Sequence, residues 1–97
     1  MITHIVLFKF RPGVDWSDPR ALVAEKVTEG HRTEIDDIVN WRCGRDVSER
    51  SDAYDFAVIG EFLDSDALAR YQHHPCHRRG VELWSALATW VVTDLVS

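Results

Sequence analysis

The side chains suited to acid–base chemistry at neutral pH are histidines, and two of the five occupy informative places. His4 lies in the apolar opening segment MITHIVLFKF, between Ile2 and Val6. An imidazole titrates at about pH 6.5, so a histidine on such a face can give or take a proton where a cleft admits a substrate. The alternative is a histidine of the core, or of an interface between subunits, that is held by hydrogen bonds.

The segment YQHHPCH, residues 71–77, contains the second of these histidines. His77 follows Pro75 at the start of a predicted helix, where the helix dipole disfavours the protonated ring and favours a neutral base. Tyr71 has a hydroxyl that could hydrogen-bond a substrate carbonyl and stabilise an enolate. The alternatives are a capping or packing role for His77, and aromatic packing for Tyr71 with its hydroxyl in water.

The same segment raises the question of a metal site, because imidazole and thiolate both bind zinc. Against it, Pro75 interrupts the helix, and the adjacent His73 and His74 cannot both face one ion from regular secondary structure. No second ligand cluster occurs elsewhere, and the sequence contains no glycine-rich phosphate loop, nucleophile elbow or His-Glu-x-x-His motif. We therefore expect neither a metal nor a cofactor.

The elements that position these side chains follow from the hydrophobic pattern and the helix caps. Asp18 and Pro19 mark the start of one helix, and Asp64 caps a second helix that Pro75 breaks. The expected buried face of the first helix consists of Leu22, Val23 and Val27. Strands are predicted over residues 2–10, 41–47, 54–62 and 89–96, and helices over 19–31 or slightly beyond, 65–73 and 76–86. This order predicts an α+β, ferredoxin-like β-α-β-β-α-β sandwich, with helices on one face of a four-stranded antiparallel sheet.

The first predicted strand is apolar on both faces. Ile2, His4 and Val6 point to one side, whereas Ile5 and Leu7 point to the other. A strand of this kind must be covered twice, and helices of the same chain can cover only one side of the sheet. A second copy of the chain on the other side is the simplest solution, so we expect a homodimer that forms through the sheets.

Composition and charge limit the classes of partner. Ninety-seven residues are enough for one domain, spanning residues 1–97, and 11 Lys and Arg against 16 Asp and Glu give a net charge of −5. This balance argues against nucleic acid or an anionic membrane as a partner. The apolar start is too short to span a membrane and lacks the features of a signal peptide. The two cysteines form no disulfide framework, so we expect a cytoplasmic protein with reduced thiols.

Three segments in order, HIVLFKF, GRDVS…YDFAVIGEF and YQHHPCH, resemble the stress-responsive A/B barrel domain family over essentially the whole chain. The resemblance implies ferredoxin-like subunits that pair through their sheets into an α+β barrel. The family is functionally mixed. It includes plant stress proteins that assemble into larger particles and a plant polyketide cyclase that performs an intramolecular aldol condensation.

The resemblance to the cyclase also implies site residues. A Tyr and a His of its Y-x-x-H-P-x-H turn act at a pocket, and Tyr71 and His77 match them here. A histidine early in its first strand lines that pocket and is matched by His4. The cyclase has a further histidine at the start of its third strand, where this chain has Phe56. The expected apolar contacts with a substrate are Val6, Phe8 and Phe56.

Two classes of function remain open. The first is a small-molecule enzyme, a cyclase-like lyase or isomerase that needs no cofactor. In it, His4 or His77 removes a proton next to the carbonyl of a polyketide-like or other apolar substrate, and Tyr71 polarises the oxygen. The second is a stress-responsive assembly protein, or a dimer that binds a small molecule without turnover. A cavity of roughly 300 Å³ or more, with all three side chains at its wall, would favour the enzyme or the carrier.

Overall fold

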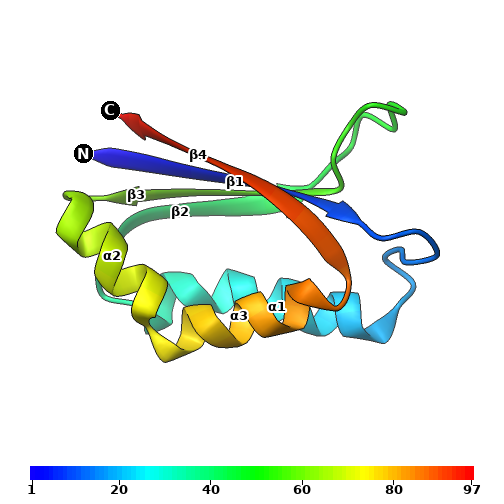
Figure 1. Ribbon diagram of the computed structural model, residues 1–97, viewed down its shortest axis with the longest axis horizontal. Helices are drawn as coiled ribbons and strands as arrows, with labels where there is room; N and C mark the ends of the chain where they lie inside the picture. Colours follow the sequence, from blue (N-terminus) through cyan, green and yellow to red (C-terminus); the bar gives the residue numbers. More distant parts are fainter.

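The computed structural model describes residues 1–97 and has the predicted order of elements. The elements are β1 (Ile2–Phe10), α1 (Pro19–Glu34), β2 (Ile38–Arg45), β3 (Phe56–Phe62), α2 (Ser65–His73), α3 (Pro75–Ser85) and β4 (Ala88–Val96). The strands form one antiparallel sheet in the order β2-β3-β1-β4. All three helices lie on one face of this sheet (Figure 1). The predicted ferredoxin-like fold class is therefore confirmed.

The two predicted helix starts have the caps that the sequence indicates. The Asp18 side chain accepts a hydrogen bond from the backbone of Arg20, and the Asp64 side chain accepts one from Ala67. The predicted break falls at His74, which ends α2 and caps α3 with its own ring. The second strand differs from its predicted range of 41–47: it begins at Ile38 and ends at Arg45. Its first residues pair with the end of β3 across a register shift, which the sequence pattern does not reveal.

The central strand β1 has one face toward the helices and one away from them. His4, Val6 and Phe8 are buried beneath the helices, while Leu7 is 36% exposed on the other face. The register places His4 between Gly60 of β3 and Asp94 of β4. Because directly paired residues of an antiparallel sheet project to the same side, Asp94 lies beside His4 on the helix-covered face.

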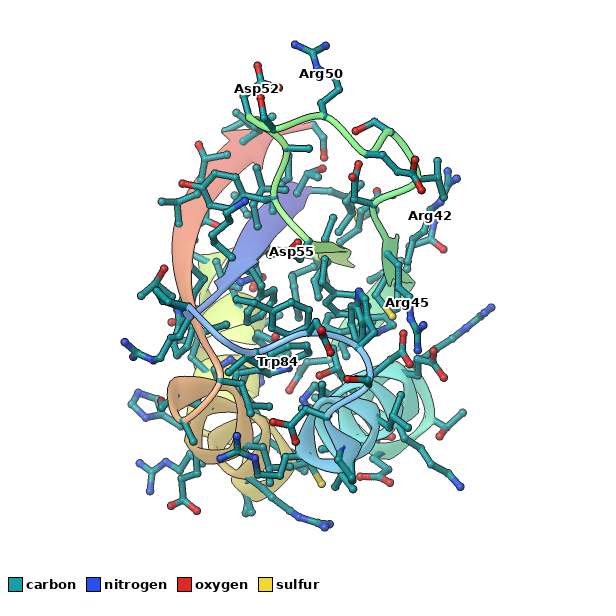
Figure 2. The ribbon with its side chains drawn as sticks, turned by 90° about the vertical axis from the view of Figure 1, so that its right-hand side faces the viewer. Arg42, Arg45, Arg50, Asp52, Asp55 and Trp84 are labelled. Carbon is teal, nitrogen blue, oxygen red and sulfur yellow. The ribbon has the colours of Figure 1, made fainter.

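Aromatic side chains fill the core at the end of the molecule where β1 leads into α1. Trp84 of α3 stacks on Phe56, with ring centroids 5.3 Å apart, and also packs against Phe8 and Trp16. Figure 2 looks onto this end and shows Trp84 enclosed between the sheet and the helices. Arg45 lies over the Trp16 ring, 4.1 Å from its centroid. This aromatic cluster closes one end of the space between sheet and helices.

The buried face of α1 is different from the one predicted. Leu22 and Val23 are 46% and 47% exposed, so that prediction is wrong for both. The side chains that α1 turns inward are instead Ala21, Ala24, Thr28 and His31. These residues follow one another at spacings of three and four, as a helical stripe requires. Two of them are alanines, so α1 sends little side-chain volume toward the sheet, and space remains between the layers.

The second face of the sheet carries no element of this chain (Figure 1). Apolar side chains gather on it, among them Leu7, Ile59, Val91 and Leu95, each 36–50% exposed. Exposed apolar side chains gathered on one face are typical of a surface that another molecule covers.

Candidate active site

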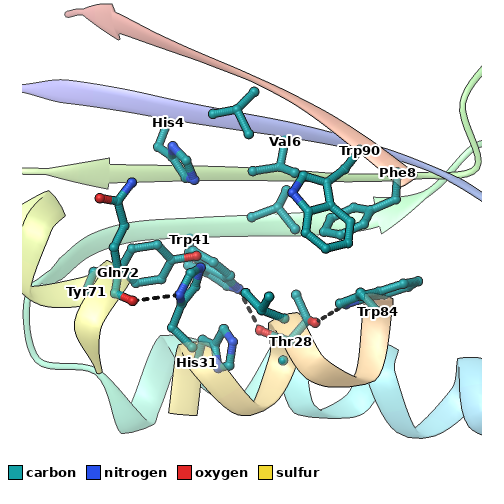
Figure 3. Close-up of a pocket in the computed structure, with 15 residues that line it drawn as sticks. His4, Val6, Phe8, Thr28, His31, Trp41, Tyr71, Gln72, Trp84 and Trp90 are labelled. Carbon is teal, nitrogen blue, oxygen red and sulfur yellow. Dashed lines mark hydrogen bonds between the residues drawn. The ribbon is translucent and has the colours of Figure 1, made fainter. Parts of the chain in front are cut away.

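A cavity of about 300 Å³ lies between the sheet and the helices (Figure 3). Nine of its 15 lining residues are hydrophobic. The full lining consists of His4, Val6, Phe8, Thr28, His31, Trp41, Val58, Tyr71, Gln72, His77, Gly80, Val81, Trp84, Trp90 and Val92. Its size matches the lower end of the range for small-molecule sites, and its polar groups are few and specific.

The exposure of the lining residues locates the mouth of the cavity. Lining residues from β1, β3 and α1 are buried, whereas Gln72, Val81 and Val92 are exposed. These three come from α2, α3 and β4. Since β4 is an edge strand, the space beside it is not closed by another strand. The cavity therefore opens between β4 and the two C-terminal helices.

His4 is held by a carboxylate from the neighbouring strand. Its Nδ1 lies 2.6 Å from Oδ1 of Asp94, and the side chains are 5% and 40% exposed. A carboxylate accepts hydrogen bonds, so Nδ1 of His4 is the donor. In the neutral ring the other nitrogen, Nε2, then carries a free lone pair. Figure 3 shows the His4 ring extending from β1 toward the helices, into the cavity.

Tyr71 and His77 lie together at the junction of α2 and α3. Their ring centroids are 4.4 Å apart, and the Tyr71 and His4 rings are 5.8 Å apart. Nδ1 of His77 donates to the carbonyl oxygen of Gln72 at 3.1 Å, which again leaves Nε2 as the acceptor. Burial lowers the pKa of His77 and raises that of Tyr71. At neutral pH the imidazole is therefore uncharged, and the phenol keeps its proton and serves as a donor.

A third histidine lines the cavity, and the sequence analysis did not select it. His31 of α1 is only 3% exposed, and its ring centroid lies 6.5 Å from that of Tyr71 and 6.3 Å from that of His77. Burial, with a smaller contribution from His77, lowers the pKa of His31 to about 4. The available signal was the helical spacing of Thr28 and His31, two polar residues on one stripe of α1.

Five of the six residues singled out as catalytic or substrate-binding lie at the cavity wall: His4, Tyr71, His77, Val6 and Phe8. The sixth, Phe56, does not line it. Its side chain is 2% exposed and stacks on Trp84 inside the aromatic cluster. The structure therefore places Phe56 behind the closed end of the cavity and not at its wall.

Two of the residues considered as metal ligands, His74 and His77, have other contacts. Nδ1 of His74 accepts a hydrogen bond from the backbone N–H of Cys76 and so caps α3, and His77 faces Gln72. No three His, Cys, Asp or Glu side chains are grouped so as to hold a metal ion. The His4, His77 and Tyr71 side chains at the cavity can each donate or accept a proton in a hydrogen bond.

No helix is long and apolar enough to span a bilayer.

Fold and cavity together define an α+β sandwich with a histidine-lined cavity between its sheet and its helices. Residues 2–97 match the model of the Stress responsive A/B Barrel Domain, and the chain belongs to this family. An uncharacterised protein of Streptomyces coelicolor is 44% identical over 94 residues, which cover 97% of each chain. The two chains therefore match over almost their whole lengths.

Two solved structures show how widely the fold is shared. A dimeric ferredoxin-like protein of unknown function from Thermobifida fusca superimposes with a TM-score of 0.87 at 24% identity, covering 99% of this chain and 90% of that one. A hydroxynitrile lyase from Passiflora edulis has a TM-score of 0.80 at 15% identity, covering 99% and 92%. At these identities the likeness is one of fold.

Proposed function

We propose that this protein is a cofactor-free enzyme that moves a proton at the carbon next to a carbonyl group of an apolar small molecule. Ring closure through the resulting carbanion is the extension of the same chemistry. The observation that supports it most is the convergence of His4, paired with Asp94, and Tyr71 and His77 on one cavity. The enzyme fold of the Passiflora edulis lyase is consistent with catalysis on this scaffold.

His4 and His77 differ in their suitability as the base. A base that takes a proton becomes an imidazolium, and a neighbouring carboxylate stabilises that charge. His4 has such a partner in Asp94, whereas His77 has only the carbonyl of Gln72. We therefore assign proton removal to Nε2 of His4. Nε2 of His77 is the second proton acceptor, placed to orient a substrate hydroxyl or to relay the proton.

Tyr71 is suited to the other half of the reaction. As the proton leaves the carbon, negative charge develops on the carbonyl oxygen, and a fixed donor stabilises it. The Tyr71 hydroxyl retains its proton because burial raises its pKa, and Figure 3 shows the ring extending into the cavity between His4 and the helices. Each of the acid and base groups would contribute roughly 10²–10⁴-fold to the rate.

The walls of the cavity define the substrate in general terms. Val6, Phe8, Val58 and the tryptophans present apolar surface, and the volume of about 300 Å³ admits a compound of modest size. An apolar or aromatic carbonyl compound fits both features.

We also propose that the working unit is a homodimer. The Thermobifida fusca relative is dimeric, and the uncovered sheet face of this chain is apolar over β1, β3 and β4. Pairing of two such faces would bury these side chains and leave both cavities on the outer, helix-covered sides.

The proton-transfer proposal is tested with simple probes in D₂O. Propiophenone and benzoylacetone are incubated with the protein, and loss of the proton signal next to the carbonyl is followed by NMR. The protein is expected to accelerate exchange over buffer, and His4→Ala or Tyr71→Phe to lower that acceleration by roughly 10²-fold or more.

The matched control is His73→Ala, an exposed histidine of α2 that does not line the cavity. This variant should exchange protons at the wild-type rate. Binding of the ketones without any acceleration would overturn catalysis and leave a binding dimer. Equal rates in wild type and His4→Ala would exclude His4 as the base.

A further inference from the structure

The proposed proton transfer leaves one cavity histidine without a task. His31 is 97% buried, with 3% of its surface exposed, and its Nδ1 is a buried atom with no hydrogen-bond partner. It is the single side-chain atom of this kind in the protein. The neighbouring buried donors are satisfied: Nε1 of Trp41 bonds the Thr28 carbonyl at 3.1 Å, and Nε1 of Trp84 bonds the Thr28 hydroxyl at 2.8 Å. Buried polar atoms are almost always paired, so this exception needs an explanation.

The structure holds the His31 ring in place from several sides. Its centroid lies 5.8 Å from the Trp41 ring and 6.5 Å from the Tyr71 ring. A Cβ at Gly80 of α3 would come within 3.0 Å of Nε2 of His31. Glycine at position 80 is therefore what allows α3 to pass so close to this imidazole. Figure 3 shows His31 at the helix side of the cavity, opposite His4 on the sheet.

The chemistry of His31 differs from that of His4. No carboxylate is bonded to it, and His77 and His74, at the start of α3, disfavour a positive charge on its ring. Glu34 acts in the opposite direction but more weakly than burial. The neutral ring has one donor and one acceptor nitrogen. A hydroxyl group, which also donates and accepts, is the natural partner for such a ring.

We propose that His31 is a substrate-binding residue that recognises a hydroxyl group, so that the substrate is an apolar carbonyl compound with a hydroxyl at a second position. This inference rests on the proposed function, because it places the carbonyl between His4 and Tyr71 and the hydroxyl on the opposite side of the cavity. The contact is assigned to Nδ1 of His31, because Nδ1 is the nitrogen without a partner and Nε2 packs against Gly80.

Matched ligands test this recognition directly. Binding of propiophenone and of its 2′-, 3′- and 4′-hydroxy isomers is measured by isothermal titration calorimetry. We expect at least one hydroxylated isomer to bind the wild-type protein about 10-fold more tightly than propiophenone, as one good hydrogen bond allows. In His31→Phe this ratio should fall to about 1, and His31→Gln should retain part of it.

His73→Phe is the control for a histidine-to-phenylalanine change, and the ratio should stay at its wild-type value there. An unchanged ratio in His31→Phe, or no preferred isomer in the wild type, overturns the inference. If His31→Phe does not fold, the imidazole ¹⁵N resonances of the wild type decide. The ¹⁵N resonances of His31 should shift when the preferred isomer is added and should not shift when propiophenone is added. Equal shifts with the two ligands overturn the proposal.

The same samples separate this inference from the proposed function. Proton exchange on propiophenone in the wild type depends on His4 and Tyr71, whereas the hydroxyl preference depends on His31. Preference without exchange would overturn the proposed catalysis and leave hydroxyl recognition standing. Proton exchange without a preference for a hydroxylated isomer would overturn hydroxyl recognition and leave the proposed catalysis standing.

Discussion

Within the cavity, the carboxylate of Asp94 determines which nitrogen of His4 faces a substrate. Because Nδ1 is bonded to Asp94 at 2.6 Å, Nε2 is left as the base. Asp94→Asn removes the negative charge and allows the wrong tautomer, so we expect the rate of proton exchange to fall by roughly 10²-fold. The fall should appear in kcat, with KM nearly unchanged, since Asp94 acts through His4.

Asp52→Asn, in the exposed loop before β3, is the control for the loss of one carboxylate. Kinetics of both variants on benzoylacetone provide the measurement. A wild-type kcat in Asp94→Asn would show that the carboxylate does not position the base.

Burial of His31 also makes the stability of the fold depend on pH. The pKa of His31 falls from 6.5 to about 4 on folding, so below pH 6.5 the unfolded chain binds a proton that the folded chain does not. The free energy of unfolding therefore keeps this contribution above pH 6.5 and loses it progressively as the pH falls from 6.5 to about 4. From the shift in the pKa of His31, we expect the free energy of unfolding to be about 2 kcal/mol lower at pH 4.5 than at pH 7.

Urea unfolding of the wild type and His31→Gln at pH 7 and pH 4.5 measures this loss. Between pH 7 and pH 4.5, the free energy of unfolding should fall by about 2 kcal/mol more in the wild type than in His31→Gln. The comparison cancels the other titrating groups, including His77, whose pKa shifts in the same direction. Parallel losses in both proteins would contradict the assignment.

The site residues divide into those that sequence reasoning can find and those that it cannot. His4, Tyr71 and His77 are visible because their residue types are suited to acid–base chemistry and match a family motif. Asp94 is not, because its role depends on the β1–β4 register that pairs it with His4. His31 was missed because a helix has several candidate stripes, and the more hydrophobic one was chosen.

Among the elements, α1 shows most clearly how packing can override hydrophobicity. Leu22 and Val23 are the larger side chains, yet they are about half exposed, while Ala21 and Ala24 are fully buried. Small residues let α1 lie close to α3 and still leave space for the cavity. The order of elements and the caps were predictable from local signals. The inward face of α1 was not, because it is determined by contacts with β2 and α3.

Thr28 joins α1 to both of these elements. Its carbonyl accepts from Trp41 of β2, and its hydroxyl accepts from Trp84 of α3. Thr28→Val keeps the size of the side chain but leaves the buried indole N–H of Trp84 without an acceptor. We expect a loss of about 1–3 kcal/mol in the free energy of unfolding, measured with urea.

Thr28→Ser is the matched control, because it removes a methyl group and keeps the hydroxyl. It should retain the hydrogen bond to Trp84 and lose less stability than Thr28→Val. A larger loss in the serine variant would show that the methyl contact, and not the hydrogen bond, holds the helix.

For the molecule as a whole, the unexplained feature is a sheet with helices on one side only. Leu7, Ile59, Val91 and Leu95 present apolar surface there, and no segment of the chain covers it. Exposed apolar surface of this extent is disfavoured in water, and burying it yields free energy in proportion to its area. A sheet-to-sheet dimer would cover the apolar side chains of β1, β3 and β4 at once.

A charge at the centre of that face should therefore separate the subunits. Ile59 is 39% exposed and pairs with Ile5 of β1 in the middle of the sheet. Ile59→Lys would place an ammonium group in an apolar interface without a partner.

Leu22→Lys, at 46% exposure on the outer side of α1, is the control. In analytical ultracentrifugation at micromolar concentration, wild type and Leu22→Lys should sediment at twice the chain mass of 11.2 kDa, and Ile59→Lys at 11.2 kDa. A monomeric wild type would mean that the open face serves something other than self-association.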